Sequence, residues 1–247
     1  MPIIYLSPST QDWNHYVTGS GSEEKNMNLL ADELIPYLRS NAIRYVRNTP
    51  DMTAASSIRQ ANAGDYDLYL ALHSNASGED AFGKNRGIIA FYYPGSARGQ
   101  QAAELIAQEL RKIYPLPHLV TTRPTSSLGE VRRSRFPAVL VEIGYHDNYQ
   151  DALWIQGHRQ EIARQLGVAL TRYFDVPFIA PMGPYQGEVD LEWGSLNLRE
   201  KPDPKGEILA RMPNDSPLTV TGSWNGWNVV EWQGLAGYAA EAYIDLD

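Results

Sequence analysis

Two apolar runs of the sequence end on side chains that can do acid–base chemistry. The run "YLALHSNASG" stays apolar up to His73 and then changes to small polar residues, and the run "VLVEIGYHDN" carries Glu142 behind an equally apolar stretch. Strand ends are where α/β proteins gather their functional groups. A carboxylate buried there is costly unless it is paired or neutralised. Glu142 therefore predicts either a salt bridge, with Arg132 or Arg133 as partner, or a chemical role.

A third candidate stands near the N-terminus. Glu24 lies in "SEEKNMN", in the first turn of an expected helix. A carboxylate is favoured there by the helix dipole, so a capping role and a functional role are both open. His73 alone is equally compatible with a histidine that only hydrogen-bonds inside the core. The three residues become one site only if the fold brings their strands and helix to one edge.

The order of the expected elements meets that condition. Strand-like runs rich in Ile, Val, Leu and Tyr occupy residues 2–6, 43–47, 67–73, 87–93 and 138–143. Helical stripes of apolar residues lie between them, the first of them interrupted by Pro36, where we expect a kink. Alternating strands and helices predict an α/β fold: a twisted, mostly parallel sheet with helices on both faces.

The pattern changes after residue 176. Residues 177–186 are rich in Pro and Gly and read as a linker between a domain of residues 1–176 and a tail of residues 187–247. The tail has short alternating strands separated by turn residues, which predicts a small all-β barrel. Its four tryptophans, at 193, 224, 227 and 232, are more than so small a core needs, and Trp227 in "WNGW" is our first choice for a binding groove.

Composition excludes several classes of protein and site. The chain has no cysteine, so disulfides, thiolate metal sites and a Cys nucleophile are excluded. No run of apolar residues is long enough to span a membrane, and no signal peptide is visible. The net charge is −8, of which −7 falls on the residues from Met182 onward. Such a chain repels phosphate backbones, so we expect no nucleic-acid partner. We expect a monomer.

Four motifs together resemble a known family. "EEKNMNLLADEL", "RQANAGDYDLYLALHSNA", "RGIIAFYY" and "PAVLVEIGYHDNYQDALWI" occur in the order and spacing of the zinc-dependent N-acetylmuramoyl-L-alanine amidases called amidase type 3. The resemblance covers residues 2–176. The tail, with "GSLNLREKPDPKGEIL" and "WNGWNVVEWQGLAGYAAEAYI", resembles the bacterial SH3-type domains of cell-wall enzymes, which implies an SH3-like barrel.

The resemblance implies roles for individual residues. Glu24 and His73 match metal ligands of the family, and Glu142 matches its catalytic glutamate. A Zn²⁺ ion with an open water position would sit between them. The family's first histidine ligand is missing, because that region reads "LSPSTQDWNHYVTG". The third ligand is therefore His15, His146 or Gln11, and the sequence leaves this choice open.

The implied function is hydrolysis of the bond between N-acetylmuramic acid and L-alanine in peptidoglycan, at the bacterial cell wall. Asn75 is a candidate substrate contact or a turn residue. Arg132 and Arg133 are candidates to meet a carboxylate of the stem peptide, or else a solvated basic face. Two alternative functions stay open: a catalytically inactive cell-wall binding protein, and a zinc peptidase that cuts within the stem peptide.

Overall fold

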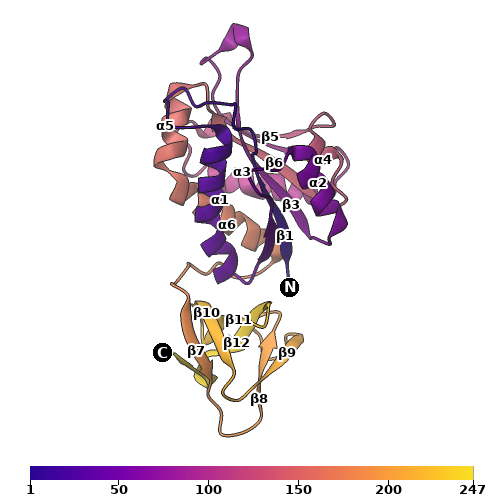
Figure 1. Cartoon of the computed structure of the whole chain (residues 1–247), viewed down its shortest axis with the longest axis vertical. Coiled ribbons are helices and arrows are strands. Elements are labelled where there is room, and N and C mark those ends of the chain that lie inside the picture. The colour runs from indigo at the N-terminus through magenta and orange to yellow at the C-terminus, as the bar shows by residue number, and fades with distance from the viewer. Residues whose placement is uncertain (247) are drawn as a thin grey trace. The chain divides into compact units, whose positions relative to one another are not determined.

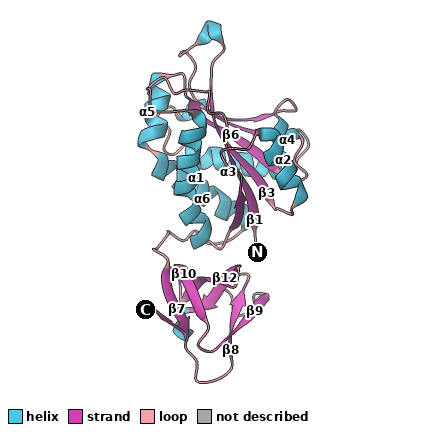
Figure 2. Cartoon of the chain, viewed as in Figure 1, coloured by secondary structure: helices cyan, strands magenta, loops and turns pink. Residues whose placement is uncertain are grey.

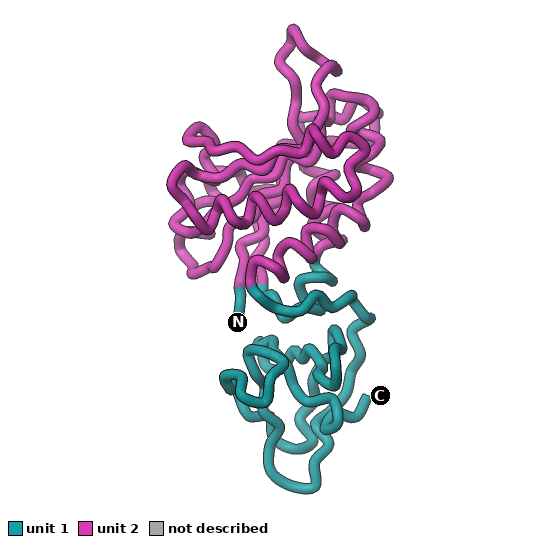
Figure 3. The backbone as a smooth tube through the Cα atoms, turned by 180° about the vertical axis from the view of Figure 1, so that it is seen from behind, with its two compact units in different colours: residues 1–2, 35–44, 175–247 teal, residues 3–34, 45–174 magenta. Residues whose placement is uncertain are grey.

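The computed structural model describes residues 1–246 and divides the chain into two compact units (Figure 3). We call residues 3–34 and 45–174 the sheet unit. Residues 1–2, 35–44 and the chain from 175 onward form the barrel unit.

The sheet unit is built on six strands in the order β2-β1-β3-β6-β4-β5. Their bounds are β1 Ile3–Pro8, β2 Arg44–Arg47, β3 Leu68–Asn75, β4 Ile88–Tyr92, β5 Val120–Pro124 and β6 Ala138–Tyr145. Strands β1, β3 and β6 run parallel, β4 pairs antiparallel with β6, and β5 pairs parallel with β4. The sheet is therefore mixed, and the carboxyl ends of its three parallel central strands meet at one edge, which we call the carboxyl edge.

Helices cover both faces of this sheet, as the alternating sequence pattern predicts. They are α1 Glu23–Ser40, α2 Ala54–Ala63, α3 Ala97–Leu110, α4 Gly129–Arg132, α5 Tyr149–Gly157 and α6 Arg159–Phe174, with 3-10 turns η1 Glu79–Ala81 and η2 Pro117–Leu119. Helices α1 and α6 lie on one side of the sheet, and α2 and α4 on the other (Figure 1). Pro36 lies inside α1, which continues for four residues beyond it, to Ser40.

Burial along the central strands explains why these runs read as continuous apolar stretches. Leu68, Leu70 and Leu72 of β3 face one side and are fully buried, and Tyr69 and Ala71 are fully buried on the other side. The second face packs under α2 and α4 in a cluster that includes Tyr5, Val131 and Leu140. A strand buried on both faces has no polar alternation, so the polar residues at its end stand out.

The structure extends two predicted strands and adds one that the sequence did not reveal. β3 and β6 run two residues past their predicted ends, to Asn75 and Tyr145. His73 and Glu142 therefore lie inside the strands, a few residues before their ends. The added strand is β5, whose sequence is "VTTRP". Its short length and its proline are poor strand signals, and its pairing with β4 at the edge of the sheet supplies what its sequence lacks.

From Tyr185 onward the barrel unit consists almost entirely of strands (Figure 2). These are β7 Tyr185–Val189, β8 Ser195–Arg199, β9 Ile208–Pro213, β10 Pro217–Trp224, β11 Trp227–Trp232, β12 Leu235–Ala240 and β13 Ile244–Leu246, with a 3-10 turn η3 Glu241–Tyr243. They pair antiparallel around a core that includes Val189, Leu198 and Val220. Across residues 1–246, no helix is both long enough and apolar enough to cross a membrane.

Candidate active site

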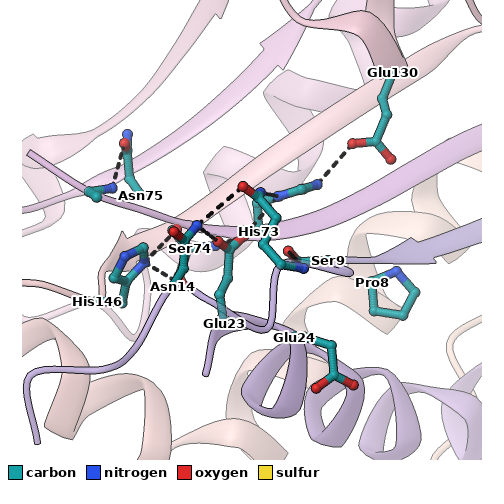
Figure 4. A network of polar contacts seen from close by, with 12 residues as sticks. Pro8, Ser9, Asn14, Glu23, Glu24, His73, Ser74, Asn75, Glu130 and His146 are labelled. Atoms are coloured by element: carbon teal, nitrogen blue, oxygen red, sulfur yellow. Dashed lines mark hydrogen bonds and ion pairs between the residues drawn. The ribbon is translucent and has the colours of Figure 1, made fainter. Parts of the chain in front are cut away.

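Polar side chains converge at the carboxyl edge of the sheet unit. His73 on β3 and Glu142 on β6 are direct neighbours in the register of the parallel pair, so both side chains leave the same face. Glu23, in the first turn of α1, reaches the same place (Figure 4). The arrangement that the sequence could only suggest, a helix start and two strand ends at one edge, is therefore present.

The imidazole of His73 is held between two carboxylates. Its Nδ1 atom lies 2.8 Å from Oε1 of Glu23, and its Nε2 atom lies 2.9 Å from Oε2 of Glu130 (Figure 4). His73, Glu23 and Glu130 are all buried. Burial lowers the pKa of His73, but the two carboxylates outweigh it and raise that pKa well above its usual value.

Glu130 is a fully bonded anchor for this ring. Its Oε1 atom accepts hydrogen bonds from the hydroxyls of Ser7 and Tyr69, both at 2.8 Å. Burial works against ionisation of Glu130, but His73 and these hydroxyls hold its pKa below the usual value. An ionised Glu130 therefore accepts a hydrogen bond from Nε2–H of His73 and fixes the orientation of the imidazole.

The contact between His73 and Glu23 requires a positive charge. When Nε2 carries the hydrogen that Glu130 accepts, a neutral imidazole presents a lone pair at Nδ1. That lone pair faces a carboxylate oxygen at 2.8 Å, which is repulsive unless a proton or a metal cation lies there. Glu23 also accepts from Asn14 Nδ2 at 2.7 Å, and His73 and Asn14 hold its pKa low in spite of burial. A proton on Nδ1 turns this contact into a favourable charged hydrogen bond.

Glu142 differs from the other two carboxylates because it has no partner. Its Oε2 atom is buried and makes no hydrogen bond with any described residue. Burial raises the pKa of Glu142 to about 7, and the nearby Glu23 and Glu130 add to the effect. A carboxylate with this pKa is suited to exchange protons near neutral pH. The salt bridge to Arg132 or Arg133, the structural alternative for Glu142, is not present among residues 1–246.

The predicted metal residues divide into those the fold brings to His73 and those it does not. Glu24 is turned away, and its carboxylate accepts from Asn28 at 3.2 Å (Figure 4). His15 is exposed, with its backbone paired to Ser22. His146 is buried against Tyr16, and its Nδ1 atom lies 2.8 Å from the carbonyl oxygen of Ser74.

Gln11 is the third-ligand candidate that the structure brings to His73. Its Nε2 atom lies 3.4 Å from His73 Nδ1. Within residues 1–246, no three His, Cys, Asp or Glu side chains are arranged so that they could hold a metal ion. The groups beside His73 that could coordinate a metal ion are its own imidazole, the carboxylate of Glu23 and the amide of Gln11.

The predicted substrate contacts lie in three places. Asn75 forms a turn, with its Oδ1 accepting from the backbone of Ala76. Arg132 ends α4 and lines a cavity on the sheet unit, and the neighbouring Arg133 is exposed. Trp227 lines a groove of about 660 Å³ in the barrel unit, together with Tyr243 and with Trp193, which is 85% exposed.

Sequence reasoning missed Glu23 and Glu130. Glu23 stands beside Glu24 in the same helical turn, so the same signal pointed to both residues. The rotation of 100° per residue along the helix decides which of the two faces the sheet. Glu130 lies in "SSLGEVRRS", a polar segment without a strong pattern. Only the short helix α4 and its packing against β3 and β6 direct Glu130 inward.

Comparison with known proteins identifies the family of each part of the chain. Residues 10–172 match the family model described as N-acetylmuramoyl-L-alanine amidase, and residues 194–245 match the bacterial SH3 domain. N-acetylmuramoyl-L-alanine amidase CwlM of Bacillus licheniformis is 25% identical over 185 residues, 71% of this chain and 70% of that protein.

Solved amidase domains share the fold of the sheet unit. The catalytic domain of CwlV from Bacillus (Paenibacillus) polymyxa superposes with a TM-score of 0.62 at 17% identity, over 72% of this chain and 100% of that one. AmiC2 of Nostoc punctiforme superposes with a TM-score of 0.61 at 14% identity, over 70% and 97%.

Proposed function

The chain belongs to the N-acetylmuramoyl-L-alanine amidase family, and we propose that it cleaves the amide bond between N-acetylmuramic acid and L-alanine with the help of a zinc ion. Family membership supports peptidoglycan as the substrate class. The cell wall is accordingly the place where we expect the protein to act.

One observation carries the zinc proposal: Nδ1 of His73 and Oε1 of Glu23, two atoms that can each coordinate a metal ion, lie only 2.8 Å apart. This donor pair fits a divalent cation, and the bond from Nε2 to Glu130 is the support that metal-binding histidines have. His73 and Glu23 would hold the ion, with the amide of Gln11 beside them in place of the family's first histidine. The chemistry that a zinc ion would supply there is a lower pKa for a bound water and polarisation of the scissile carbonyl.

Glu142 is the group that moves the proton in this proposal. Its unpartnered Oε2 atom faces no competing donor, so it is free to accept a proton from water at the site. The same carboxyl group then returns the proton to the nitrogen of L-alanine as the amide bond breaks. Glu130 does not take part in proton transfer, because its oxygens are committed to His73, Ser7 and Tyr69.

Product analysis on purified peptidoglycan tests the proposed reaction. The expected products are intact stem peptides with a free L-alanine amino group and glycan strands that keep the lactyl carboxylate on muramic acid. Peptides cut within the stem would identify a stem-peptide peptidase instead. Sacculi that are bound but not cleaved, by a protein saturated with zinc, would identify an inactive binding protein.

We propose that the barrel unit holds the protein on the cell wall through its aromatic groove. With a charge of −7 from Met182 onward, it repels anionic polymers, so apolar and stacking contacts are the available attraction. Trp193→Ala and Trp227→Ala in the full chain should each weaken binding to sacculi by about 30-fold, the loss of an anchor worth about 2 kcal/mol.

Trp224→Ala is the matched control for these variants. Trp224 is 36% exposed but lies outside the groove, so its removal should leave the affinity unchanged. The comparison is made by co-sedimentation with sacculi at low and high salt, with Glu142→Gln added to every protein to prevent lysis. Binding that disappears at high salt would contradict an apolar mode of attachment.

A further inference from the structure

A second polar feature of the sheet unit lies at the other end of β6 from Glu142. It is a cavity of about 460 Å³ whose wall includes Arg98, Arg132 and Arg135, together with Ala138 at the start of β6. No Asp or Glu lines this cavity. The three guanidinium groups repel one another in a protein whose net charge is −8, so their gathering is not a general basic character of the surface.

Two of the arginines are held in position by contacts that leave their charge uncompensated. Arg98 donates from Nε to the hydroxyl of Tyr173 at 3.1 Å, with its guanidinium 5.1 Å from that ring centre. Arg135 donates from Nη1 to the carbonyl oxygen of Asn62 at 2.8 Å. None of the cavity's arginines forms an ion pair with a residue that the structure describes. Positioned guanidinium groups without a carboxylate partner are suited to bind an oxyanion.

The cavity and the candidate active site share one face of the sheet. Glu142, Leu140 and Ala138 lie on the face of β6 that carries His73. Helix α4 contributes to both places: Glu130 near its start contacts His73, and Arg132 at its end lines the cavity. On β4 this face carries Ile89, Phe91 and Tyr93, because Ile89 is registered with Glu142 and Phe91 with Leu140. Ile89 is buried, Phe91 is half-buried and Tyr93, just after the strand, is exposed. The surface therefore opens along β4 from Phe91 toward the arginines.

The distance from Glu142 to the cavity identifies what can reach from one to the other. Ala138 and Glu142 are four strand residues apart, about 13 Å. An extended peptide of four residues covers about the same distance. A stem peptide whose amide to muramic acid lies at Glu142 therefore places the carboxylate of its far end among the arginines.

We propose that this cavity binds the terminal carboxylate of the stem peptide, and that the enzyme thereby distinguishes stems with a free carboxylate from stems whose end is blocked. This inference rests on the proposed amidase function and adds a specificity site to it. Arg132 and Arg98 are the groups that would receive the carboxylate, and Arg135 adds positive charge.

Calorimetric titration of the full-length Glu142→Gln protein tests the proposal without hydrolysis. The two probes are a muramyl tetrapeptide with a free terminal carboxylate and the same compound with a terminal carboxamide. We expect the free acid to bind about 10-fold more tightly or better, because charge-assisted bonds to arginine are lost in the amide. Replacing Arg98 and Arg132 by Gln should abolish the difference, and Arg132→Lys alone should keep part of it.

Arg59→Gln is the control, because Arg59 is an exposed arginine of α2 outside the cavity. If the double variant does not fold, as judged by circular dichroism, the affinities of the single variant Arg132→Gln for the two probes test the proposal. This variant should fold, because Arg132 is exposed and its side chain makes no hydrogen bond within the described chain. Equal affinity of the unchanged cavity for the two probes would overturn the proposal. Equal affinity together with arginine-dependent binding of glycerol 1-phosphate would overturn it in favour of a phosphate polymer.

Hydrolysis of the same probes by the enzyme with Glu142 separates this inference from the proposed function. Cleavage of both probes with equal kcat/KM would contradict the carboxylate site and leave the amidase proposal standing. Preferential binding of the free acid without cleavage of either probe would support the carboxylate site and contradict the amidase proposal.

Discussion

His73 and His146 lie at the ends of neighbouring strands, both buried, and the fold treats them differently. His73 contacts two carboxylates, one at each ring nitrogen. His146 contacts the carbonyl and hydroxyl oxygens of Ser74 through Nδ1 and stacks on Tyr16, and it touches no carboxylate. Two histidines at one edge of one sheet therefore have different chemistry because their partners differ. Residue type and position at a strand end are not sufficient to identify a site.

Removal of each histidine tests this contrast and should give the largest effect. His73→Ala should lose zinc. Transfer of one proton contributes about 10²–10⁴-fold to the rate, and we expect hydrolysis to fall by more than that. His146→Ala should keep zinc and most activity, and should lower the free energy of unfolding by about 1–3 kcal/mol. The measurements are zinc content by mass spectrometry and release of peptide from sacculi. Full zinc occupancy in His73→Ala would remove the distinction between the two residues.

Glu142→Gln separates proton transfer from metal binding at the same edge. The amide keeps the size and shape of the side chain but cannot accept the proton. We expect zinc content to be unchanged and kcat to fall by about 10²–10⁴-fold. A loss of zinc from Glu142→Gln would instead make Glu142 a ligand and would require the roles of the three carboxylates to be reassigned.

The carboxylates around His73 sharpen the comparison further. Glu130→Gln should weaken zinc binding by about 10–100-fold, the usual cost of removing the support of a metal-binding histidine. Glu23→Gln should weaken it at least as much. Glu24→Gln is the matched control one residue away, because its carboxylate contacts Asn28 rather than His73. Competition with a chromogenic chelator measures all three affinities, and an effect of Glu24→Gln as large as that of Glu23→Gln would contradict the geometry.

Gln11→His should give the smallest and most specific change. It supplies an imidazole where the family's first histidine is expected, next to His73 Nδ1. Catalytic zinc sites in proteins usually have three strong ligands, so the variant should retain zinc more tightly during dialysis against a chelator. Gln11→Asn is the control for shortening the side chain. Unchanged zinc retention in Gln11→His would place Gln11 outside the metal site.

Much of this arrangement could be predicted from the sequence, and the parts that could not be predicted have identifiable physical reasons. His73 and Glu142 were predictable because a polar residue behind a fully apolar strand is conspicuous. The choice between Glu23 and Glu24 was not, because neighbouring residues on a helix differ only in direction. Glu130 was not predictable, since its segment owes its inward direction to packing that is absent from the local pattern. The arginine cavity joins α3 to the segment around α4, which are about 35 residues apart in the chain and share no motif.

Diffraction data collected at the zinc absorption edge, on crystals grown with one equivalent of zinc, test the central claim most directly. We predict an anomalous peak that contacts Nδ1 of His73 and the carboxylate of Glu23, with Glu130 still bonded to Nε2. A peak on His15 or His146, or none beside His73 with zinc in excess, would contradict the account.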